Sequence, residues 1–402
     1  MKLILTLILA AAVVVPACAD ASGLIVDRVV VLMRHGVRSP THEPPVSKLF
    51  APDPWPKWPG KPGDLTAHGA AALRLLGAYE RGLLGREGVL GTSGCPLLGA
   101  VSIHADVDER TVASGQAFAD GFAPGCNLMI DHRAHGHDPL FSGLGDGKMP
   151  LNAAKARAAI LVAAGGTLAD AVKAHITLFQ GLQAVLDPDG HAILDQKSRI
   201  VPKRGVPEAT GPLKIGKTAS ETLLLEYEQG LKRNQVGWGR VDQAGVARLL
   251  ALHPLAGAIL HRPLYIASLT AGMLAQHMLK LLSETGPLRY ALLVGHDTTI
   301  DELGGLLDLH WHPRGFPADD PPPDAMLGFM RLTDPTTDKH YVEAFFQVQG
   351  MNQVRDLTRL NESHKPRFLV LPIPGCPAKP GWPGLCTLAA FRQHVDERIV
   401  VH

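Results

Sequence analysis

Apolar residues along the chain gather in runs that end in polar clusters. The stretch "LIVDRVVVLMRHG", residues 24–36, is apolar on both faces and ends at a glycine. A run of this length and composition is typical of a strand buried on both sides of a parallel sheet. Two more strands are predicted at "AVSIHADVDE", residues 100–109, and at "YALLVGHD", residues 290–297.

Helical patterns accompany these strands. Thr66 can cap a helix through "AHGAAALRLLGAYERGLL", and "RTVASGQAFADGFA" predicts a second helix directly after residues 100–109. Strands and helices that alternate with short links predict an α/β fold with a mostly parallel central sheet flanked by helices. Further strands are predicted towards the C-terminus, at "AMLGFMRLTD", "HYVEAFFQVQG" and "RFLVLPIP".

The middle of the chain has a different character. Residues 132–270 hold mostly helical patterns, among them "LNAAKARAAILVAAGG", "TLADAVKAHITLFQGLQAVL", "TASETLLLEYEQGLKRN" and "QAGVARLLALHPLAGAILHR". We interpret this stretch as an inserted, mainly helical smaller domain. The α/β domain would then comprise residues 20–131 and 271–402.

The N-terminus, "MKLILTLILAAAVVVPACADASG", joins one lysine, an apolar run and a group of small residues. This pattern predicts a secretory signal peptide over residues 1–19, too short to span a bilayer stably. Cleavage would fall at Ala17-Cys18-Ala19, and a lipoprotein acylated at Cys18 is the alternative. No later segment reaches the length of a membrane helix without charges. We therefore expect a periplasmic or secreted protein.

Removal of the signal peptide leaves four cysteines, Cys95, Cys126, Cys376 and Cys386. An even number in an exported chain indicates disulfides. Four cysteines allow three pairings, and proximity in the sequence favours Cys95–Cys126 and Cys376–Cys386. No Cys-x-x-Cys motif occurs, so a redox or zinc-ribbon role has little support.

Composition describes a globular protein, with 46% hydrophobic and 19% charged residues. The 39 lysines and arginines nearly balance the 38 aspartates and glutamates, so no overall field favours nucleic acid. The 19 histidines would make the chain cationic in acid, which suits an anionic ligand; a tolerated surface residue is the alternative reading of histidine.

Three predicted strands end in clusters of arginine, histidine and acidic residues: "RHGVRSPT" at 34–41, "DVDERT" at 106–111 and "GHDTT" at 295–299. Ligands of open α/β sheets bind beyond the carboxyl ends of the strands. Arginine presents a planar fork that matches phosphate, histidine is a nucleophile towards phosphorus, and an aspartic acid can protonate a departing alkoxide. Each motif alone is weak, and their joint occurrence at strand ends points to phosphoryl chemistry.

"RHGVRSPT" with a distant "GHDTT" resembles the histidine acid phosphatases, branch two of the histidine phosphatase superfamily. The stretches "DPWPKWPGKPGDLTAHG", "ADVDERTVASGQAFADGFAPGC", "DPLF", "GWGR" and "GC…LCTLAAF" look like the bacterial acid phytases, in the same order and over nearly all of the mature chain. The resemblance implies an exported acid phosphomonoester hydrolase, with a small anionic phosphomonoester as substrate, no cofactor, no metal, and no nucleic acid or membrane partner. We also expect a monomer.

The resemblance assigns roles to single residues. His35 matches the nucleophile, which forms a phosphohistidine intermediate, and Asp297 matches the general acid. The residues that match the phosphate-binding set are Arg34, Arg38, Arg110 and His296. Substrate contacts are implied for Thr41 and, in the helical stretch, for Glu221 and His253.

Other readings remain beside this one. Thr299 and His42 stand where many bacterial phytases have asparagine and lysine, so a broad-specificity or sugar-phosphate acid phosphatase is the alternative to a phytase. A non-catalytic periplasmic anion-binding protein would need the arginines but no proton donor. The histidines of "HRAHGHD", His132, His135 and His137, are the one tempting metal set, which the family does not use.

Overall fold

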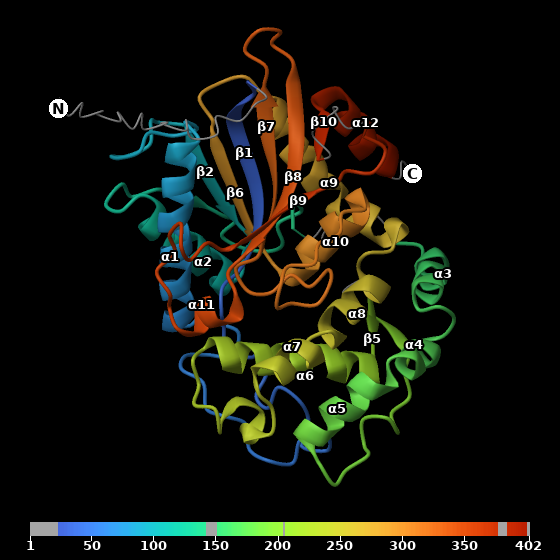
Figure 1. Cartoon of the computed structure of the whole chain (residues 1–402). Helices are drawn as coiled ribbons and strands as arrows, with labels where there is room; N and C mark the ends of the chain where they lie inside the picture. Colours follow the sequence, from blue (N-terminus) through green and yellow to red (C-terminus); the bar gives the residue numbers. More distant parts are fainter. Residues whose placement is uncertain (1–22, 142–150, 204–205, 377–383, 400–402) are drawn as a thin grey trace, which may run out of the picture.

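The computed structural model describes residues 23–141, 151–203, 206–376 and 384–399 (Figure 1). The predicted signal peptide lies outside the described residues. A central sheet occupies the upper part of the molecule in Figure 1, and a group of helices lies below it.

The sheet has eight strands in the order β10-β8-β7-β1-β6-β2-β3, with β9 paired to β8. All the strand stretches predicted from the sequence are present. The bounds are β1 Ile25–Arg34, β2 Val101–Ala105, β3 Ile130–Asp131, β6 Tyr290–Gly295, β7 Met326–Thr333, β8 His340–Val348, β9 Arg367–Leu371 and β10 Leu385–Thr387.

The prediction of a mostly parallel sheet is wrong for one half of it. β1, β6, β2 and β3 run parallel to one another, whereas β7 is antiparallel to β1, and β8 is antiparallel to β7, β9 and β10. The short connection between Thr333 and His340 accounts for the antiparallel pairing of β7 with β8, because a parallel crossover needs a dozen or more residues. The sheet is therefore mixed, with β1 at the boundary between its halves.

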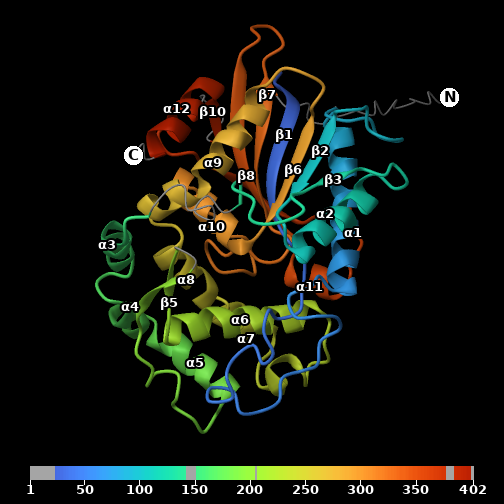
Figure 2. The same ribbon diagram turned by 180° about the vertical axis from the view of Figure 1, so that it is seen from behind.

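Helices cover both faces of the sheet. α1 (Ala67–Arg86) and α2 (Glu109–Phe122) lie on one face, and α9 (Leu264–Ser283), α10 (Asp297–Leu307) and α12 (Leu388–Arg398) lie on the other (Figures 1 and 2). Alternate residues of β1 enter two hydrophobic clusters: Val29, Val31 and Met33 pack on the side of α1 and α2, and Val30 and Leu32 on the other. Burial on both faces explains the uninterrupted apolar run.

The stretch predicted to be helical contains most of the remaining helices. Their bounds are α3 Ala153–Ala163, α4 Leu168–Ala174, α5 Ile176–Leu186, α6 Pro212–Glu228, the 3-10 turn η1 Val236–Gly239, α7 Gln243–Leu249 and α8 Leu252–Leu260. One antiparallel hairpin, β4 (Ile200–Lys203) with β5 (Val206–Ala209), was not predicted. α11 (Met351–Arg355) lies beside α6 near the foot of the sheet.

One segment in the described part of the chain, Gln243–Leu260, is long and apolar enough to cross a membrane. The bent pair Ala153–Ala174 and Ile176–Leu186 would pass the same test as one broken span. Since 61% of Gln243–Leu260 is buried inside the protein, this is weak evidence for a membrane span, and core helices of soluble proteins meet the same criterion.

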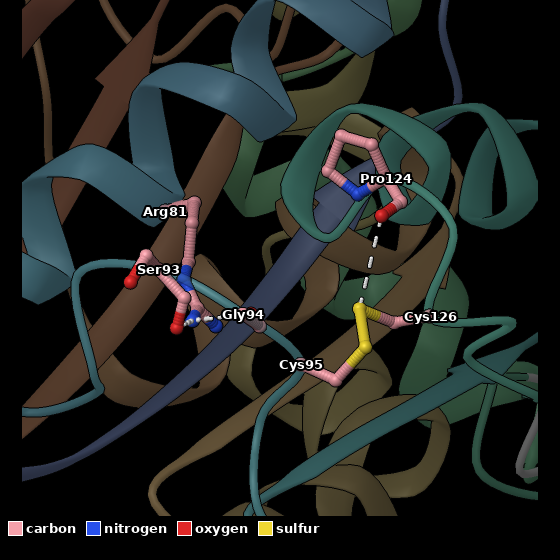
Figure 3. Close-up of a disulfide and its surroundings, with 6 residues drawn as sticks. All are labelled: Arg81, Ser93, Gly94, Cys95, Pro124 and Cys126. Atoms are coloured by element: carbon pink, nitrogen blue, oxygen red, sulfur yellow. Dashed lines mark hydrogen bonds between the residues drawn. A yellow bond between two sulfur atoms is a disulfide. The ribbon is translucent and has the colours of Figure 1, made fainter.

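Both disulfides favoured by sequence proximity are present in the structure. Cys95 and Cys126 have Cα atoms 5.4 Å apart, and those of Cys376 and Cys386 are 5.3 Å apart. Figure 3 shows the first bridge, which ties the loop after α1 to the end of α2. Beside it Arg81 donates a hydrogen bond of 3.0 Å to the carbonyl oxygen of Gly94.

Candidate active site

The three polar strand ends lie at one edge of the sheet. β6 lies between β1 and β2, all three are parallel, and so their carboxyl ends point the same way. The backbone N–H of His35 donates to Gly295 at 3.0 Å, and that of Asp106 donates to Val294 at 2.9 Å. The motifs at residues 34–41, 106–111 and 295–299 are thereby brought together, as the sequence predicted.

His35 lies at the centre of this edge and is 1% exposed. Its Nδ1 is 2.9 Å from the carbonyl oxygen of Gly36, so Nδ1–H donates and Nε2 keeps its lone pair. Burial, together with the positive charges of Arg34 and Arg38, holds the pKa of His35 well below its usual value. The imidazole is therefore neutral in mild acid and available as a nucleophile.

Two arginines of the first motif share one carboxylate. Glu221 of α6 accepts hydrogen bonds at 3.0 and 3.1 Å from Nη2 of Arg38, and Oε1 of Glu221 also accepts from Nη2 of Arg34. Burial raises the pKa of Glu221, but the positive charges of Arg38 and Arg34 outweigh burial and bring the pKa down to about 2. Glu221 is thus an anion that neutralises the arginines in the ligand-free protein. An incoming phosphate would compete with it for the same guanidinium groups.

Arg110 and His296 form a second cationic group. Asp108 Oδ2 accepts from Nη2 of Arg110 at 2.5 Å and lies 2.9 Å from Nε2 of His296. The hydrogen bond from His296, helped by the charge of Arg110, lowers the pKa of Asp108 to about 2. Burial lowers the pKa of His296, but its hydrogen bonds to Asp106 and Asp108 outweigh that effect and raise it.

Asp297 is the first residue of α10, and its carboxylate has two cationic neighbours. Oδ2 lies 3.1 Å from Nζ of Lys217 and 3.1 Å from Nε2 of His253. Burial raises the pKa of Asp297, but Lys217, Arg34 and His253 together hold it well below its usual value. His253 in turn places Nδ1 2.7 Å from Oδ1 of Asp320.

The remaining predicted substrate contact lies at the rim. Thr41 is exposed, and its hydroxyl is 3.0 Å from Nδ1 of His42. A Cβ atom placed on Gly63 would meet both Thr41 and Arg110 within 4 Å, so these two side chains border the same backbone turn. The structure thus gathers every sequence-predicted site residue around one edge, with His35 buried and Thr41 facing solvent.

The chemistry of this site does not fit a bound metal. Glu221, His253 and Asp297 place ligand-type atoms within 4.8 Å of one another. Lys217 already contacts the same oxygen of Asp297, and two arginines contact Glu221, so a cation would meet like charges. His132, His135 and His137 are exposed and belong to no group of metal-ligand type in the described part of the chain.

Two residues of the site were missed by the sequence analysis. Lys217 lies four residues before Glu221, a spacing that puts both on one face of a helix. The helix was expected to begin at residue 218, but α6 begins at Pro212 and includes Lys217. Asp320 lies in the loop of residues 308–325, where no motif marks it as a site residue.

Comparison with known proteins agrees with this geometry. A family model described as "Histidine phosphatase superfamily (branch 2)" matches residues 25–181. The phytase AppA of Escherichia coli (strain K12) is 34% identical over 398 residues, which cover 92% of this chain and 91% of that protein. The chain belongs to branch 2 of the histidine phosphatase superfamily. The family resemblance predicted from the motifs is confirmed.

Two further proteins extend the comparison. A glucose-1-phosphatase of Providencia rettgeri is 27% identical and covers 97% of both chains. The structure of Hafnia alvei phytase in complex with myo-inositol hexakis sulphate superposes with a TM-score of 0.88 and 29% identity, over 94% of this chain and 98% of that one. The similarity in fold to the Hafnia alvei phytase therefore extends over almost the whole chain.

Proposed function

We propose that the protein is an exported acid phosphatase of phytase type, which hydrolyses phosphomonoesters through a phosphohistidine intermediate. The observation that carries the proposal is the neutral, buried His35 with three arginines at the same edge of the sheet. Membership of the branch 2 family supports it, as does the similarity to the phytase AppA.

The first step transfers the phosphoryl group to the protein. Arg34, Arg38 and Arg110 bind the phosphate oxygens and neutralise the charge that builds up in the transition state. Nε2 of His35 attacks phosphorus, and the bond from phosphorus to the leaving oxygen breaks. Asp297 supplies the proton that the departing alkoxide requires.

The second step releases phosphate. Water attacks the phosphorus of phosphohistidine, the P–N bond breaks, and one proton of the water returns to Asp297. His296, whose pKa is raised, is placed to bind the phosphate as a cation. The chemistry needs no metal or organic cofactor.

Inositol hexakisphosphate is the substrate that we favour. The sulphated inositol bound by the Hafnia alvei phytase is an analogue of that molecule, and the two folds match closely. The alternative is a sugar-phosphate preference, since a glucose-1-phosphatase is also similar over the whole chain. Phosphate release from phytate, glucose 1-phosphate and 4-nitrophenyl phosphate at acid pH would separate the two.

Export is part of the proposal. The N-terminal signal pattern and the two disulfides support a periplasmic or secreted location, because disulfides persist in oxidising compartments. We also propose that the chain acts as a monomer and that residues 132–270 form a mainly helical insert.

The nucleophile is the most direct point to test. His35→Ala removes the attacking nitrogen, so turnover of every phosphomonoester should be abolished while the fold is retained. Rapid quenching of the wild-type protein should trap an acid-labile, base-stable phosphoryl label that His35→Ala lacks. Turnover of the variant within tenfold of the wild type would overturn the assignment.

A further inference from the structure

We propose that His253 stores the proton that Asp297 gives to the leaving group, and that Asp320 holds His253 in position for this exchange. The proposal rests on the proposed phosphatase function and adds two positioning residues to it. It stands on a continuous chain of three side chains, Asp297–His253–Asp320, that leads from the reacting edge into the protein interior.

Both ring nitrogens of His253 have a carboxylate partner. Its side chain is fully buried, with Nε2 3.1 Å from Oδ2 of Asp297 and Nδ1 2.7 Å from Oδ1 of Asp320. Both ring nitrogens therefore point at carboxylate oxygens, an arrangement that suits a doubly protonated ring.

Asp320 is itself held in place. Its side chain is fully buried, and its backbone carbonyl accepts a hydrogen bond of 2.8 Å from Nε1 of Trp311. Asp319 binds the backbone N–H of Trp311 through Oδ1 at 3.0 Å. These contacts fix the loop of residues 308–325 so that the Asp320 carboxylate faces His253.

The charges around the ring favour a proton on it. Burial lowers the pKa of His253, but the hydrogen bonds to Asp297 and Asp320 raise it to about 9. The titratable groups that interact with the ring are Asp297 and Asp301 from α10, Glu221 from α6, Asp320 from the loop, and His261 just beyond the end of its own helix. Lys217 of α6 contacts the same oxygen of Asp297 as Nε2 of His253 does.

The proton on His253 explains how Asp297, which is ionised in the ligand-free protein, acts as an acid. Asp297 is ionised in the ligand-free protein, since its pKa is held well below the usual range, and an ionised carboxylate cannot act as an acid. Binding of a phosphate dianion beside Asp297 adds negative charge and raises the proton affinity of the carboxylate. The nearest proton is then the one on Nε2 of His253.

The proton balance closes over one turnover. In the first step His253 passes its Nε2 proton to the Asp297 carboxylate, which protonates the leaving oxygen as the P–O bond breaks and the bond from His35 to phosphorus forms. The neutral His253 ring keeps its proton on Nδ1 and donates it in a hydrogen bond to Asp320. In the second step a proton of the attacking water returns through Asp297 to Nε2 of His253.

The test compares leaving groups. His253→Gln keeps a hydrogen-bonding side chain but cannot store a proton, and Asp320→Asn keeps the shape but removes the charge. Single-turnover rates would be measured from pH 3 to pH 8 with glycerol 2-phosphate, a poor leaving group, and with 4-nitrophenyl phosphate, a good one. Glu80→Gln, a buried carboxylate hydrogen-bonded to Gln347, serves as the matched control.

We expect His253→Gln to slow hydrolysis of glycerol 2-phosphate by about 10- to 100-fold, and that of 4-nitrophenyl phosphate by no more than about threefold. The first loss is smaller than the roughly 10²–10⁴-fold typical of losing the general acid itself, because Asp297 remains and can take its proton from solvent. The basic limb of the glycerol 2-phosphate profile should move to lower pH, because Asp297 must then take its proton from solvent. Asp320→Asn should move this basic limb in the same direction by a smaller amount. Glu80→Gln should leave the pH profile unchanged.

Two results would overturn the proposal: equal losses on both substrates with an unchanged pH profile, which indicates a purely structural role, or no loss on either substrate. Circular dichroism and thermal melting identify a variant that fails to fold, in which case Asp320→Asn alone decides. Failure of the proposed function is a separate outcome, because the wild type would then hydrolyse neither substrate and form no phosphohistidine.

Discussion

Glu226 lies on α6 with its side chain fully buried, and it forms no ion pair with a positive side chain in the described part of the chain. Oε2 accepts a hydrogen bond of 2.9 Å from the backbone N–H of Gly237, and Oε1 has no hydrogen-bond partner among the described residues. Burial raises the pKa of Glu226 to about 8, although the hydrogen bond from Gly237 lowers it. The folded protein therefore prefers the neutral acid.

The pH dependence of stability follows from this pKa. The carboxyl titrates near 4.5 when exposed and near 8 in the folded state, so its contribution is present below pH 4.5 and is lost as pH rises towards 8. One unit of pKa corresponds to about 1.4 kcal/mol, so Glu226 alone should reduce the free energy of unfolding by about 3 kcal/mol between pH 5 and pH 8.

Urea unfolding at pH 5 and pH 8 measures the effect. Glu226→Gln replaces the neutral acid by a neutral amide of the same shape, so its stability at pH 5 should be close to that of the wild type. Its loss between pH 5 and pH 8 should be about 3 kcal/mol smaller. Glu87→Gln, at an exposed carboxylate, is the control. Equal pH dependence of Glu226→Gln and wild type would refute the reasoning.

Three further predictions concern the site and the covalent framework. Asp297→Asn should reduce turnover of alkyl phosphates by about 10²–10⁴-fold and spare aryl phosphates, whereas Arg110→Ala should impair both alike, as steady-state rates on the two substrate types would show. Glu221→Gln should lower the Kd for inorganic phosphate, measured by calorimetry, because the arginines lose a competing anion; weaker binding would contradict this. Alanine at both Cys95 and Cys126 should cost about 3–4 kcal/mol in urea unfolding through loss of loop closure.

Much of the fold could be predicted because its signals are local. Apolar runs with charged ends marked the buried strands, and the 3.6-residue pattern marked the long helices. The hairpin β4–β5 gave no such signal, because Pro202 and Pro207 face each other across it and proline argues against a paired strand. The antiparallel pairing of β7 with β8 could have been predicted from the short connection between them.

The candidate site divides in the same way. His35, Arg110 and Asp297 could be predicted because their motifs follow strands whose ends share an edge. Asp320 could not, since nothing in "ADDPPPD" indicates that one aspartate faces a histidine 67 residues away. Such a pairing depends on how a loop packs against a helix, which is a property of the whole fold.

The antiparallel direction of β7 has a consequence for how this enzyme can diversify. A parallel neighbour would have presented its carboxyl end beside His35, but β7 presents its beginning, so the loop of residues 308–325 arrives there as well. Two hydrogen bonds anchor this loop: the Arg34 guanidinium donates to the carbonyl oxygen of Pro321, and the backbone N–H of Asp324 donates to the carbonyl oxygen of His35. Selection, or a library confined to this loop, could therefore retune the proton supply of the reaction while every residue of the two signature motifs stays unchanged.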